Sequence, residues 1–420
     1  MLKKLGRNYW LLVYEGIMFG GGIIILNTGG IVALFINTMT GSNMLIGLAV
    51  TVVSMTSILG QMVGAPFTNS IRDLPVFLSK IYFVNRIIPF FMAIPLFLDM
   101  SANQSVIIFM ILLGLFFILD GLMVVPWGEL YARSIKPEMR IHMFGVMISL
   151  AGIFSLIIGL LLTWLLATPI LSDNHRFAYL FILSGIFLLL SVIGIRLVKD
   201  PNPVSEPEKP DVIQFYKQIP QIIKGSKPLQ NAIIARIPSF IGFAATAFLI
   251  VFGAGQLELS DAQISWLVYA NIIGSIIGGI FLAEISRKYG NKMLILICNI
   301  GIIIVLCMAV SLIFTPYLGY IWLFIICILA SITLNSWFGY FTYFIEIAPE
   351  KDRPLYQLVG LCIGIPFGLT GLIMGIIIDN FGFLPMFLIC GVFAVISTLL
   401  TLRLLSKNKV TELANRYIEE

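Results

Sequence analysis

The sequence predicts an all-α polytopic membrane protein whose twelve transmembrane helices form two pseudo-symmetric six-helix bundles. The first observation behind this prediction is composition: of 420 residues, 59% are hydrophobic and only 11% are charged. Soluble domains carry about 25% charged residues, so a soluble globular fold is excluded. The second observation is a series of long apolar stretches, and the third is a glycine pattern that occurs twice, about half a chain apart.

The apolar stretches are each long enough to cross a bilayer as a helix, which takes about 20 residues. Twelve of them occur, at residues 10–36, 43–66, 76–98, 104–128, 144–169, 177–198, 230–253, 262–283, 293–314, 320–345, 357–379 and 383–404. The alternating ten-residue strands of a membrane barrel are absent from the sequence. The chain is therefore expected to span the membrane as helices.

A charged, proline-rich segment at 200–210 separates the first six spans from the last six. Such composition is typical of an exposed linker, and residues 213–223 after it are expected to form a short amphipathic helix on the membrane surface. The expected parts are an N-terminal bundle at 1–199, a cytoplasmic linker at 200–229, a C-terminal bundle at 230–404 and a cytoplasmic tail at 405–420.

The glycine pattern indicates that the two halves are related. Gly60 and Gly64 in the second span are followed 214 residues later by Gly274 and Gly278 in the eighth, and so long a period is typical of a duplicated bundle. Glycines four residues apart let helices approach closely in lipid, in surfaces that either slide or pack statically. The eleventh span has the same spacing at Gly364/Gly368 and Gly371/Gly375.

The distribution of Lys and Arg predicts the orientation of the chain. If the N-terminus is inside, the loops on that side hold nearly all the cations, whereas the outer loops hold only Arg176. This asymmetry places both termini in the cytoplasm and predicts a multi-pass protein of the plasma membrane. The formal net charge of +5 then reflects topology, and no nucleic-acid partner is expected.

Four charged side chains fall inside the predicted spans, where an ionisable group is costly and therefore a functional candidate. Arg86 and Asp120 lie at similar depth on consecutive spans, so they can pair, for structural or functional reasons. Glu15 or Asp120 is a candidate for coupling proton movement to solute movement. The alternative for Glu15 is an inner-end residue that reaches headgroups or a loop cation, and Arg236 is expected to reach toward water.

Enzymatic chemistry has no visible constellation in this sequence. The two histidines, His142 and His175, stand in different loops, and no clustered carboxylates or metal-spaced ligands occur. The five cysteines are interpreted as small buried hydrophobes. Without a phosphate-binding loop, direct use of ATP is not expected. We predict neither a metal nor a cofactor.

The basic loop Arg287-Lys288-Tyr-Gly290-Asn-Lys292, between the second and third spans of its half, resembles the inner-loop motif of the major facilitator superfamily. The six-plus-six arrangement with a long central loop resembles that family as well. The match is partial, because Arg287 replaces the usual acid and Val76 replaces the late glycine of the first-half copy.

Shorter segments resemble one bacterial branch of this superfamily, namely 39–48 and 346–356, the latter with a first-half counterpart at 131–140. Pro-Trp127-Gly-Glu129 is similar to a segment of the glycoside–cation symporters. The Gly-Pro pair of multidrug antiporters is missing from the fifth span, which lowers but does not remove an exporter interpretation.

The resemblance implies a secondary active transporter that works by alternating access on a small organic solute, with protons as the expected coupling ion and a monomer in the lipid bilayer as the expected state. The alternatives are an exporter of amphipathic compounds and, from another class, a receptor on a transporter fold that does not transport.

The resemblance also implies that the first and fourth helices of each half line the cavity. The polar and aromatic candidates there are Asn27, Thr333, Asn335, Trp337, Tyr340 and Tyr343. They suit a ring-shaped or amphipathic solute, or they hold helices together as polar packing groups. Inner loops of this family suggest a gate made of Gly64, Arg72, Asp73, Gly278, Arg287, Lys288, Gly290, Lys292, Arg140 and Arg353, for which the alternative is a purely topological role.

Overall fold

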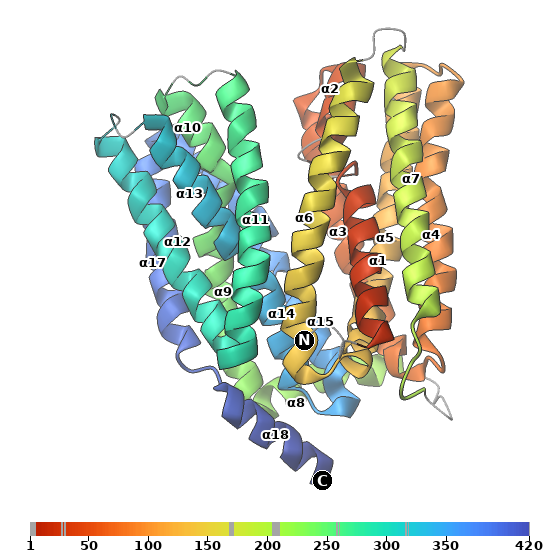
Figure 1. Ribbon diagram of the computed structural model, residues 1–420, viewed down its shortest axis with the longest axis vertical. Coiled ribbons are helices and arrows are strands. Elements are labelled where there is room, and N and C mark those ends of the chain that lie inside the picture. The colour runs from red at the N-terminus through yellow and green to blue at the C-terminus, as the bar shows by residue number, and fades with distance from the viewer. Residues whose placement is uncertain are drawn as a thin grey trace. The chain divides into compact units, whose positions relative to one another are not determined.

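The computed structural model describes residues 6–26, 28, 31–167, 172–203, 211–257, 259, 261–315, 317 and 319–419. Every regular element within these ranges is a helix (Figure 1). Ten helical segments among the described residues are long and apolar enough to cross a membrane. The expectation of an all-α polytopic membrane protein is confirmed.

The chain divides into two compact units, the first made of Met1–Lys136 with Leu150–Phe215 and the second of Pro137–Ser149 with Tyr216–Glu420. The first unit contains α1 (Arg7–Ile23), α2 (Ile31–Thr40), α3 (Asn43–Gly64), the 3-10 helix η2 (Ala65–Ser70), α4 (Leu74–Phe97), α5 (Ala102–Ser134) and α7 (Asp173–Leu197). Helix α6 (Pro137–Ala167) gives its first turns to the second unit and the rest to the first.

Within the first unit, α3 packs along α5, and α7 packs against both α1 and α4. Aromatic rings fill its core, where Phe35 contacts Phe109 and Phe181 at ring-centroid distances of 4.9 and 5.4 Å. Offset and edge-to-face ring pairs of this kind add about 0.5–1.5 kcal/mol each beyond the area they bury.

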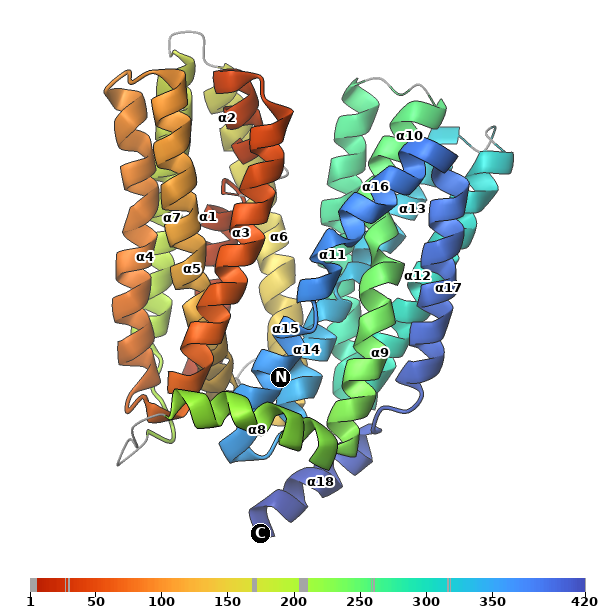
Figure 2. The same ribbon diagram turned by 180° about the vertical axis from the view of Figure 1, so that it is seen from behind.

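The second unit is built from a longer series of helices. They are α9 (Lys227–Ala244), η3 (Ala245–Phe248), α10 (Leu249–Leu257), α11 (Asp261–Tyr289), α12 (Asn291–Phe314), α13 (Gly319–Leu334), α14 (Ser336–Glu346), η5 (Glu350–Asp352), α15 (Arg353–Cys362), η6 (Ile365–Leu369), α16 (Thr370–Phe381) and α17 (Phe383–Thr401). Helix α11 packs on α13, and α17 packs on α9 and α12 (Figure 2). The first turns of α6 join this unit through Ser149, whose Oγ donates to the Ile276 carbonyl at 2.9 Å.

Several predicted spans are interrupted in the structure: the seventh by η3, the tenth between α13 and α14, and also the first and the eleventh. The first, expected at 10–36, ends as α1 at Ile23 and resumes as α2 at Ile31. The eleventh, expected at 357–379, is split into α15, η6 and α16. Glycine and proline disfavour continuous helix, and Gly20, Gly21 and Gly22 precede the break in the first span while Pro366 stands at the break in the eleventh. Apolar length alone therefore predicted continuity that the backbone does not keep.

The repeated glycines occupy equivalent positions in the two units. A Cβ at Gly60 or Gly64 of α3 would overlap the backbone carbonyls of Ile118 and Leu122 on α5. In the second unit, a Cβ at Gly274 of α11 would likewise overlap a backbone carbonyl on α13. The same helix pair of each half is thus held at backbone contact, as the small-residue spacing predicts.

The close-packing interpretation is wrong for the last glycine pair. A Cβ at Gly371 or Gly375 would have no heavy atom within 4 Å. A Cβ at Gly364 would meet the ring of Phe240 and the carbonyl of Leu361 on its own side of the break, and no backbone atom of a neighbouring helix is among its nearest contacts. Four-residue spacing therefore identified the tight contacts of α3 and α11, but it gave a false signal in the interrupted eleventh span.

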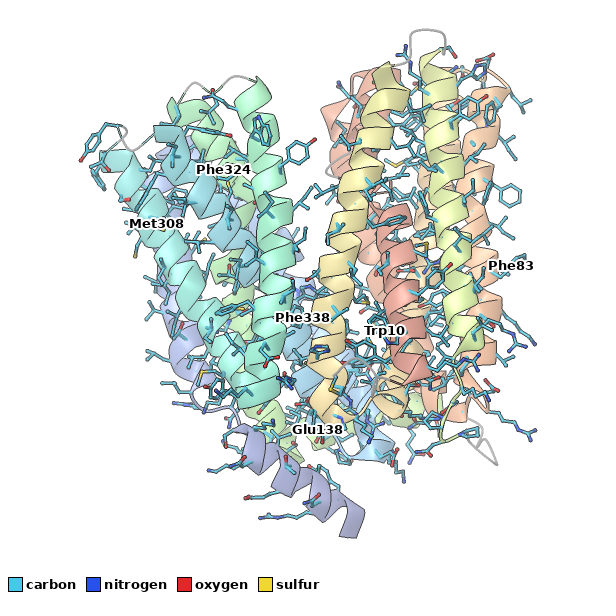
Figure 3. The ribbon with its side chains drawn as sticks, viewed as in Figure 1. Trp10, Phe83, Glu138, Met308, Phe324 and Phe338 are labelled. Atoms are coloured by element: carbon cyan, nitrogen blue, oxygen red, sulfur yellow. The ribbon has the colours of Figure 1, made fainter. Side chains whose placement is uncertain are left out.

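The outer surfaces of both units are apolar. Phe83 on α4 is 54% exposed and projects away from the first unit (Figure 3), and Ile321 on α13 is 74% exposed. By contrast, Phe338 on α14 is fully buried beside Phe144. Large apolar side chains that face outward match contact with lipid, where water does not penalise them.

Two helices lie outside the spans. Helix α8 (Val212–Gly225) forms where a short amphipathic helix was expected and contains no buried residue. Helix α18 (Lys407–Glu419) forms within the segment that was expected only as a tail. The sequence of α18 is polar and amphipathic, so the search for apolar spans passed over it.

Candidate functional site

The charged residues predicted at membrane depth in the first unit come together. Arg86 on α4 lies with its Nη1 atom 2.9 Å from Asp120 Oδ1 on α5. Depth along consecutive helices predicted this pair, and the structure contains it. Arg86 is 1% exposed and Asp120 is 18% exposed, so the guanidinium is buried while the carboxylate keeps contact with a more open side.

Three aromatic rings surround the guanidinium of Arg86. Its Cζ atom lies 4.7 Å from the ring centroid of Phe19, 4.6 Å from that of Tyr82 and 5.4 Å from that of Phe116. Cation–π contacts of this kind are worth about 2 kcal/mol when they are desolvated. Helices α1, α4 and α5 thus build a fixed seat for one positive charge.

One buried hydrogen-bond donor of Arg86 is not satisfied by the side chains and carbonyls that the structure describes. Asn85, with its amide oriented to satisfy both of its ends, accepts from Arg86 Nη1 at 3.2 Å and donates to the Phe116 carbonyl at 3.1 Å. Arg86 Nε is buried and has no acceptor among the described residues. A buried donor left unsatisfied costs about 1–3 kcal/mol, so this atom is available to a bound solute or water.

Glu15 on α1 is a second buried carboxyl in the same cluster. It is 4% exposed, and its Oε2 accepts a hydrogen bond from Trp127 Nε1 on α5 at 3.3 Å. It lies within electrostatic range of Arg86 and Asp120. Neither alternative from the sequence applies, because Glu15 is enclosed and its hydrogen-bond partner is an indole rather than a loop cation.

The arrangement places two carboxyl groups around one guanidinium. When both carboxyls are ionised, the cluster carries one excess negative charge in a setting that disfavours uncompensated charge. One proton, or one cationic group, neutralises that excess.

Sequence reasoning missed Trp127 and Tyr82 as members of this cluster. Tyr82 stands one helical turn before Arg86, and Trp127 stands two turns after Asp120. Residues at these spacings share a helix face. A search for aromatic residues on the faces that carry the buried charges would have found both.

Arg236 on α9 has a different environment from the one expected. Instead of simply reaching toward water, its guanidinium lies 4.3 Å from the Phe240 ring centroid and 4.5 Å from that of Tyr340. Its Nη1 donates to Ser239 Oγ at 3.5 Å, and no carboxylate in the described part of the chain forms an ion pair with it. Arg236 is therefore a second aromatic-stacked cation, in the second unit.

The polar residues predicted to line a cavity on the tenth span have mixed environments. Thr333 and Asn335 are buried and bond to backbone carbonyls, Asn335 Nδ2 to Ser275 on α11 at 3.4 Å. Tyr340 is buried under Arg236, whereas Trp337 is 46% exposed. The contacts of Thr333 and Asn335 are those of polar packing between helices, which was the alternative interpretation. Asn27 lies outside the described residues.

The cationic side chains of the loop between α11 and α12 contact groups of the second unit itself. Arg287 forms an ion pair with Glu284 one turn earlier, and Lys288 lies 5.0 Å from the ring centroid of Tyr289. Lys292 Nζ donates to the Leu402 carbonyl at 2.6 Å. These contacts fix the loop within the second unit.

Gly290 makes the turn between these two helices possible. Its φ of +87° is a conformation that side chains rarely adopt. A Cβ on it would also lie 2.8 Å from Lys407 Cβ at the start of α18. Lys407 Nζ donates to the Arg287 carbonyl at 2.7 Å. The glycine therefore serves both the turn and the seating of the last helix.

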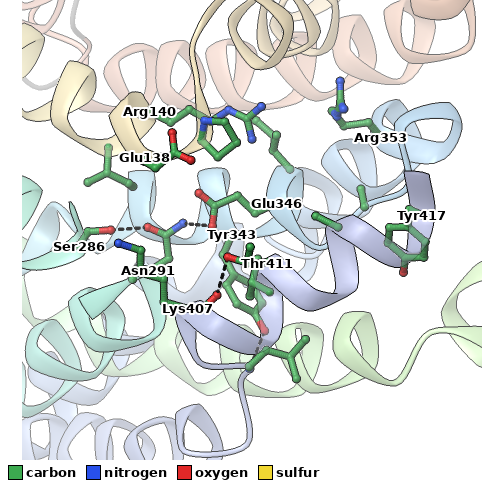
Figure 4. Close-up of a pocket in the computed structure, with 18 of the residues that line it drawn as sticks. Glu138, Arg140, Ser286, Asn291, Tyr343, Glu346, Arg353, Lys407, Thr411 and Tyr417 are labelled. Carbon is green, nitrogen blue, oxygen red and sulfur yellow. Dashed lines mark hydrogen bonds between the residues drawn. The ribbon is translucent and has the colours of Figure 1, made fainter. Parts of the chain in front are cut away.

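A cavity of about 640 Å³ opens beside this loop in the second unit. Glu346 at the end of α14 accepts from Asn291 Nδ2 at 2.7 Å, and Asn291 Oδ1 accepts from Ser286 Oγ at 2.6 Å (Figure 4). Arg140 and Arg353, both predicted loop residues, line the same cavity. The segment around Glu346 resembles the family in sequence, but no sequence pattern predicts this series of hydrogen bonds from Ser286 through Asn291 to Glu346.

The first-half copy of the loop has simpler contacts. Arg72 and Asp73 are exposed, and Asp73 caps α4 by accepting from the Val76 backbone N–H at 3.0 Å. In the same unit, an ion pair near the end of α5 has Arg133 Nε 2.8 Å from Glu129 Oε1. Glu129, which is buried, and Glu346, which is partly buried, are thus carboxylates near the end of the fourth helix of each half.

The sequence and the fold of this chain can be compared with those of known proteins. The family model of the Major Facilitator Superfamily matches residues 232–420. No curated protein matches the sequence. Over nearly the whole chain, however, the fold is similar to solved structures of transport proteins.

Three of these structures illustrate the likeness. A bacterial homologue of the iron transporter ferroportin, in an outward-facing state, is 11% identical with a TM-score of 0.72, over 95% of this chain and 99% of that one. The fucose:proton symporter FucP of E. coli is 14% identical with a TM-score of 0.66, over 94% and 98%. The proton:xylose symporter XylE is 14% identical with a TM-score of 0.71, over 94% of each chain. At such identities the likeness shows the fold alone.

Proposed function

We propose that this chain is a member of the Major Facilitator Superfamily, whose model matches its residues 232–420, and that it is a secondary active transporter which couples the movement of a small organic solute to protons. The fold of its neighbours supports transport by alternating access, and the family and neighbours are carriers rather than enzymes. Protons and an organic solute are the parts of the proposal that need a test.

The observation that carries the proposal is the buried cluster of Glu15, Arg86 and Asp120 in the first unit. When one of the two carboxyls around the guanidinium binds a proton, the net charge of the cluster changes by one unit. We assign Glu15 as the proton-binding group, because its Oε2 is held by Trp127 rather than by a cation. Asp120, paired with Arg86, keeps the guanidinium charge balanced.

The solute side of the site is assigned to the same cluster. Arg86 Nε offers a buried donor without an acceptor, which suits a carbonyl, hydroxyl or carboxylate oxygen of the solute. The indole of Trp127, stacked on the ring of Tyr131 at a centroid distance of 5.6 Å, offers an apolar face. A small oxygen-bearing solute with an apolar or ring-shaped body fits these two features.

The loop contacts of the second unit are proposed to hold one end of the transporter in shape during the transport cycle. The chain from Ser286 through Asn291 to Glu346 fixes the ends of α11, α12 and α14 to one another. We propose that this end is cytoplasmic, in agreement with the excess of Lys and Arg in its loops.

The test is transport by purified protein in proteoliposomes that contain an acidity-reporting dye, challenged with sugars, organic acids and cationic dyes. Glu15→Gln and Asp120→Asn are compared with wild type and with Asp379→Asn, which alters an exposed carboxyl of α16. We expect a solute to move protons with wild type and Asp379→Asn. Glu15→Gln should still exchange the solute across the bilayer but move no protons.

Other outcomes are equally informative. Solute flux with unchanged proton movement in Glu15→Gln would refute the assignment of Glu15. Binding of a solute without flux would favour a receptor, and flux of cationic dyes out of the vesicles in exchange for protons would favour an exporter.

A further inference from the structure

Three sulfur atoms meet in the core of the second unit. Cys390 Sγ on α17 lies 3.9 Å from Met374 Sδ on α16 and 4.0 Å from Met386 Sδ on α17. Met386 and Cys390 are one helical turn apart and therefore share a face, and α16 brings Met374 against that face. All three side chains are buried, and Met374 is the most exposed of them at 4%.

The two distances from Cys390 are those expected between the ligands of a three-coordinate metal site. A metal–sulfur bond is about 2.3 Å long, so three sulfurs in a plane around one ion stand about 4 Å apart. Both distances from Cys390 already have this value. Cys390 is therefore placed to share one ion with each of the two methionines.

The chemistry of the ligands points to one class of ion. Thiolate and thioether sulfur are soft ligands that select Cu(I) over hard cations such as Mg²⁺. We propose that Met374, Met386 and Cys390 form a binding site for a single soft monovalent cation, Cu(I). On binding, the Cys390 thiol gives its proton to solvent and forms the metal–sulfur bond as a thiolate, with no change in the oxidation state of the metal.

Charge balance supports a monovalent ion at this position. The site lies among apolar residues of the second core, including Leu249, Phe383 and Phe387. One Cu(I) with one thiolate is neutral, so the bound state leaves no charge in the apolar core, whereas a divalent ion would leave one positive charge uncompensated.

Spacing rules applied to the sequence do not find this site. Two of its three ligands are methionines, and Met374 comes from a different helix than Cys390. Among the described residues, no group of three His, Cys, Asp or Glu side chains could hold a metal ion. The chain thus has no competing site of that type in its described part, which gives a binding experiment a low background.

The experiment is metal titration of the purified full-length protein in detergent. Ag(I), a redox-stable analogue, and Cu(I) are each added in competition with a chromophoric chelator of known affinity. We expect wild type to bind one equivalent. Cys390→Ser should weaken binding at least 100-fold, and Met374→Leu and Met386→Leu about 10-fold each, the range seen for altered metal sites. X-ray absorption of the copper-loaded protein should show sulfur neighbours at about 2.3 Å.

The control is Cys327→Ser, because Cys327 is similarly buried in the same core. It should bind the metal as wild type does. Unfolding temperatures without metal identify any variant that fails to fold, and the two Met→Leu variants, which nearly conserve volume, keep the test open if Cys390→Ser does not fold.

Two results would overturn the proposal: no binding by wild type in the presence of the chelator, or binding that survives Cys390→Ser. In the first case the sulfurs are packing atoms only. The readout involves no transport, so its failure is separate from any failure of the proposed transport function.

Discussion

The Arg86–Asp120 pair allows structural and coupling roles to be separated by mutation. Asp120→Asn removes the countercharge of a guanidinium that is 1% exposed, while the carboxylate that it replaces is 18% exposed. Breaking a buried ion pair from one side costs about 3–5 kcal/mol, because the remaining charge is left uncompensated. Glu15 stays within electrostatic range of Arg86, and three aromatic rings and the Asn85 amide still hold the guanidinium, so we expect the lower end, about 3 kcal/mol.

The double variant Arg86→Gln/Asp120→Asn supplies the comparison. With both charges of the pair gone, Glu15 is the single carboxyl left in the cluster, and with a proton bound it is neutral. No uncompensated ion then remains, and we expect the loss of stability to fall to about 1 kcal/mol. Glu15→Gln should cost less than about 1 kcal/mol, because the amide oxygen can still accept from Trp127. The order of stability should therefore be wild type, Glu15→Gln, the double variant and Asp120→Asn.

Unfolding temperatures in detergent provide the assay. For domains of about 200 residues, 1 kcal/mol corresponds to roughly 2–4 °C, so Asp120→Asn should unfold about 6–12 °C below wild type. The double variant should recover more than half of that difference. If Asp120→Asn unfolds with wild type, or if the double variant is less stable than Asp120→Asn, the argument that the pair neutralises a buried charge is wrong.

Two further changes test the packing and the last helix. Gly60→Ala would force a methyl group into the Ile118 carbonyl and should destabilise the first unit by about 2 kcal/mol, whereas Gly47→Ala, on the same helix with no neighbour within 4 Å, should leave the unfolding temperature unchanged or slightly raised. Tyr343→Phe removes the acceptor of the 2.9 Å hydrogen bond from the Leu405 backbone and should make α18 more sensitive to limited proteolysis, with little change in global unfolding; equal protease sensitivity in both proteins would contradict the role assigned to this bond.

The fold and part of the site follow from local properties of the sequence. Apolar length predicted the spans, and depth along neighbouring helices placed Arg86 opposite Asp120. The glycine pattern predicted close packing of α3 and α11 but not their partners, and Gly60 and Gly274 indeed leave no room for any residue larger than glycine. These signals succeed where the residues of one helix alone determine how long it is, how deep its charges lie or how closely another helix can pack on it.

Other features depend on contacts that no local pattern encodes. The hydrogen bond between Asn291 and Glu346 joins residues 55 positions apart, and the sulfur contacts of Cys390 depend on how α16 folds back on α17. The break between α1 and α2 was hidden because glycine costs a helix only about 1 kcal/mol per residue, which tertiary packing can outweigh in either direction. Such features require the three-dimensional arrangement.

The contact between Lys407 and the turn at Gly290 has a practical consequence for handling the protein. Lys407 anchors α18 to the loop between α11 and α12 through the Arg287 carbonyl. A purification tag or fluorescent protein fused after α18 would be attached to the helix that contacts this loop and could disturb that contact. A tag placed before α1 instead leaves the contact between α18 and this loop undisturbed. A comparison of the two tagged proteins would show whether the position of the tag affects function.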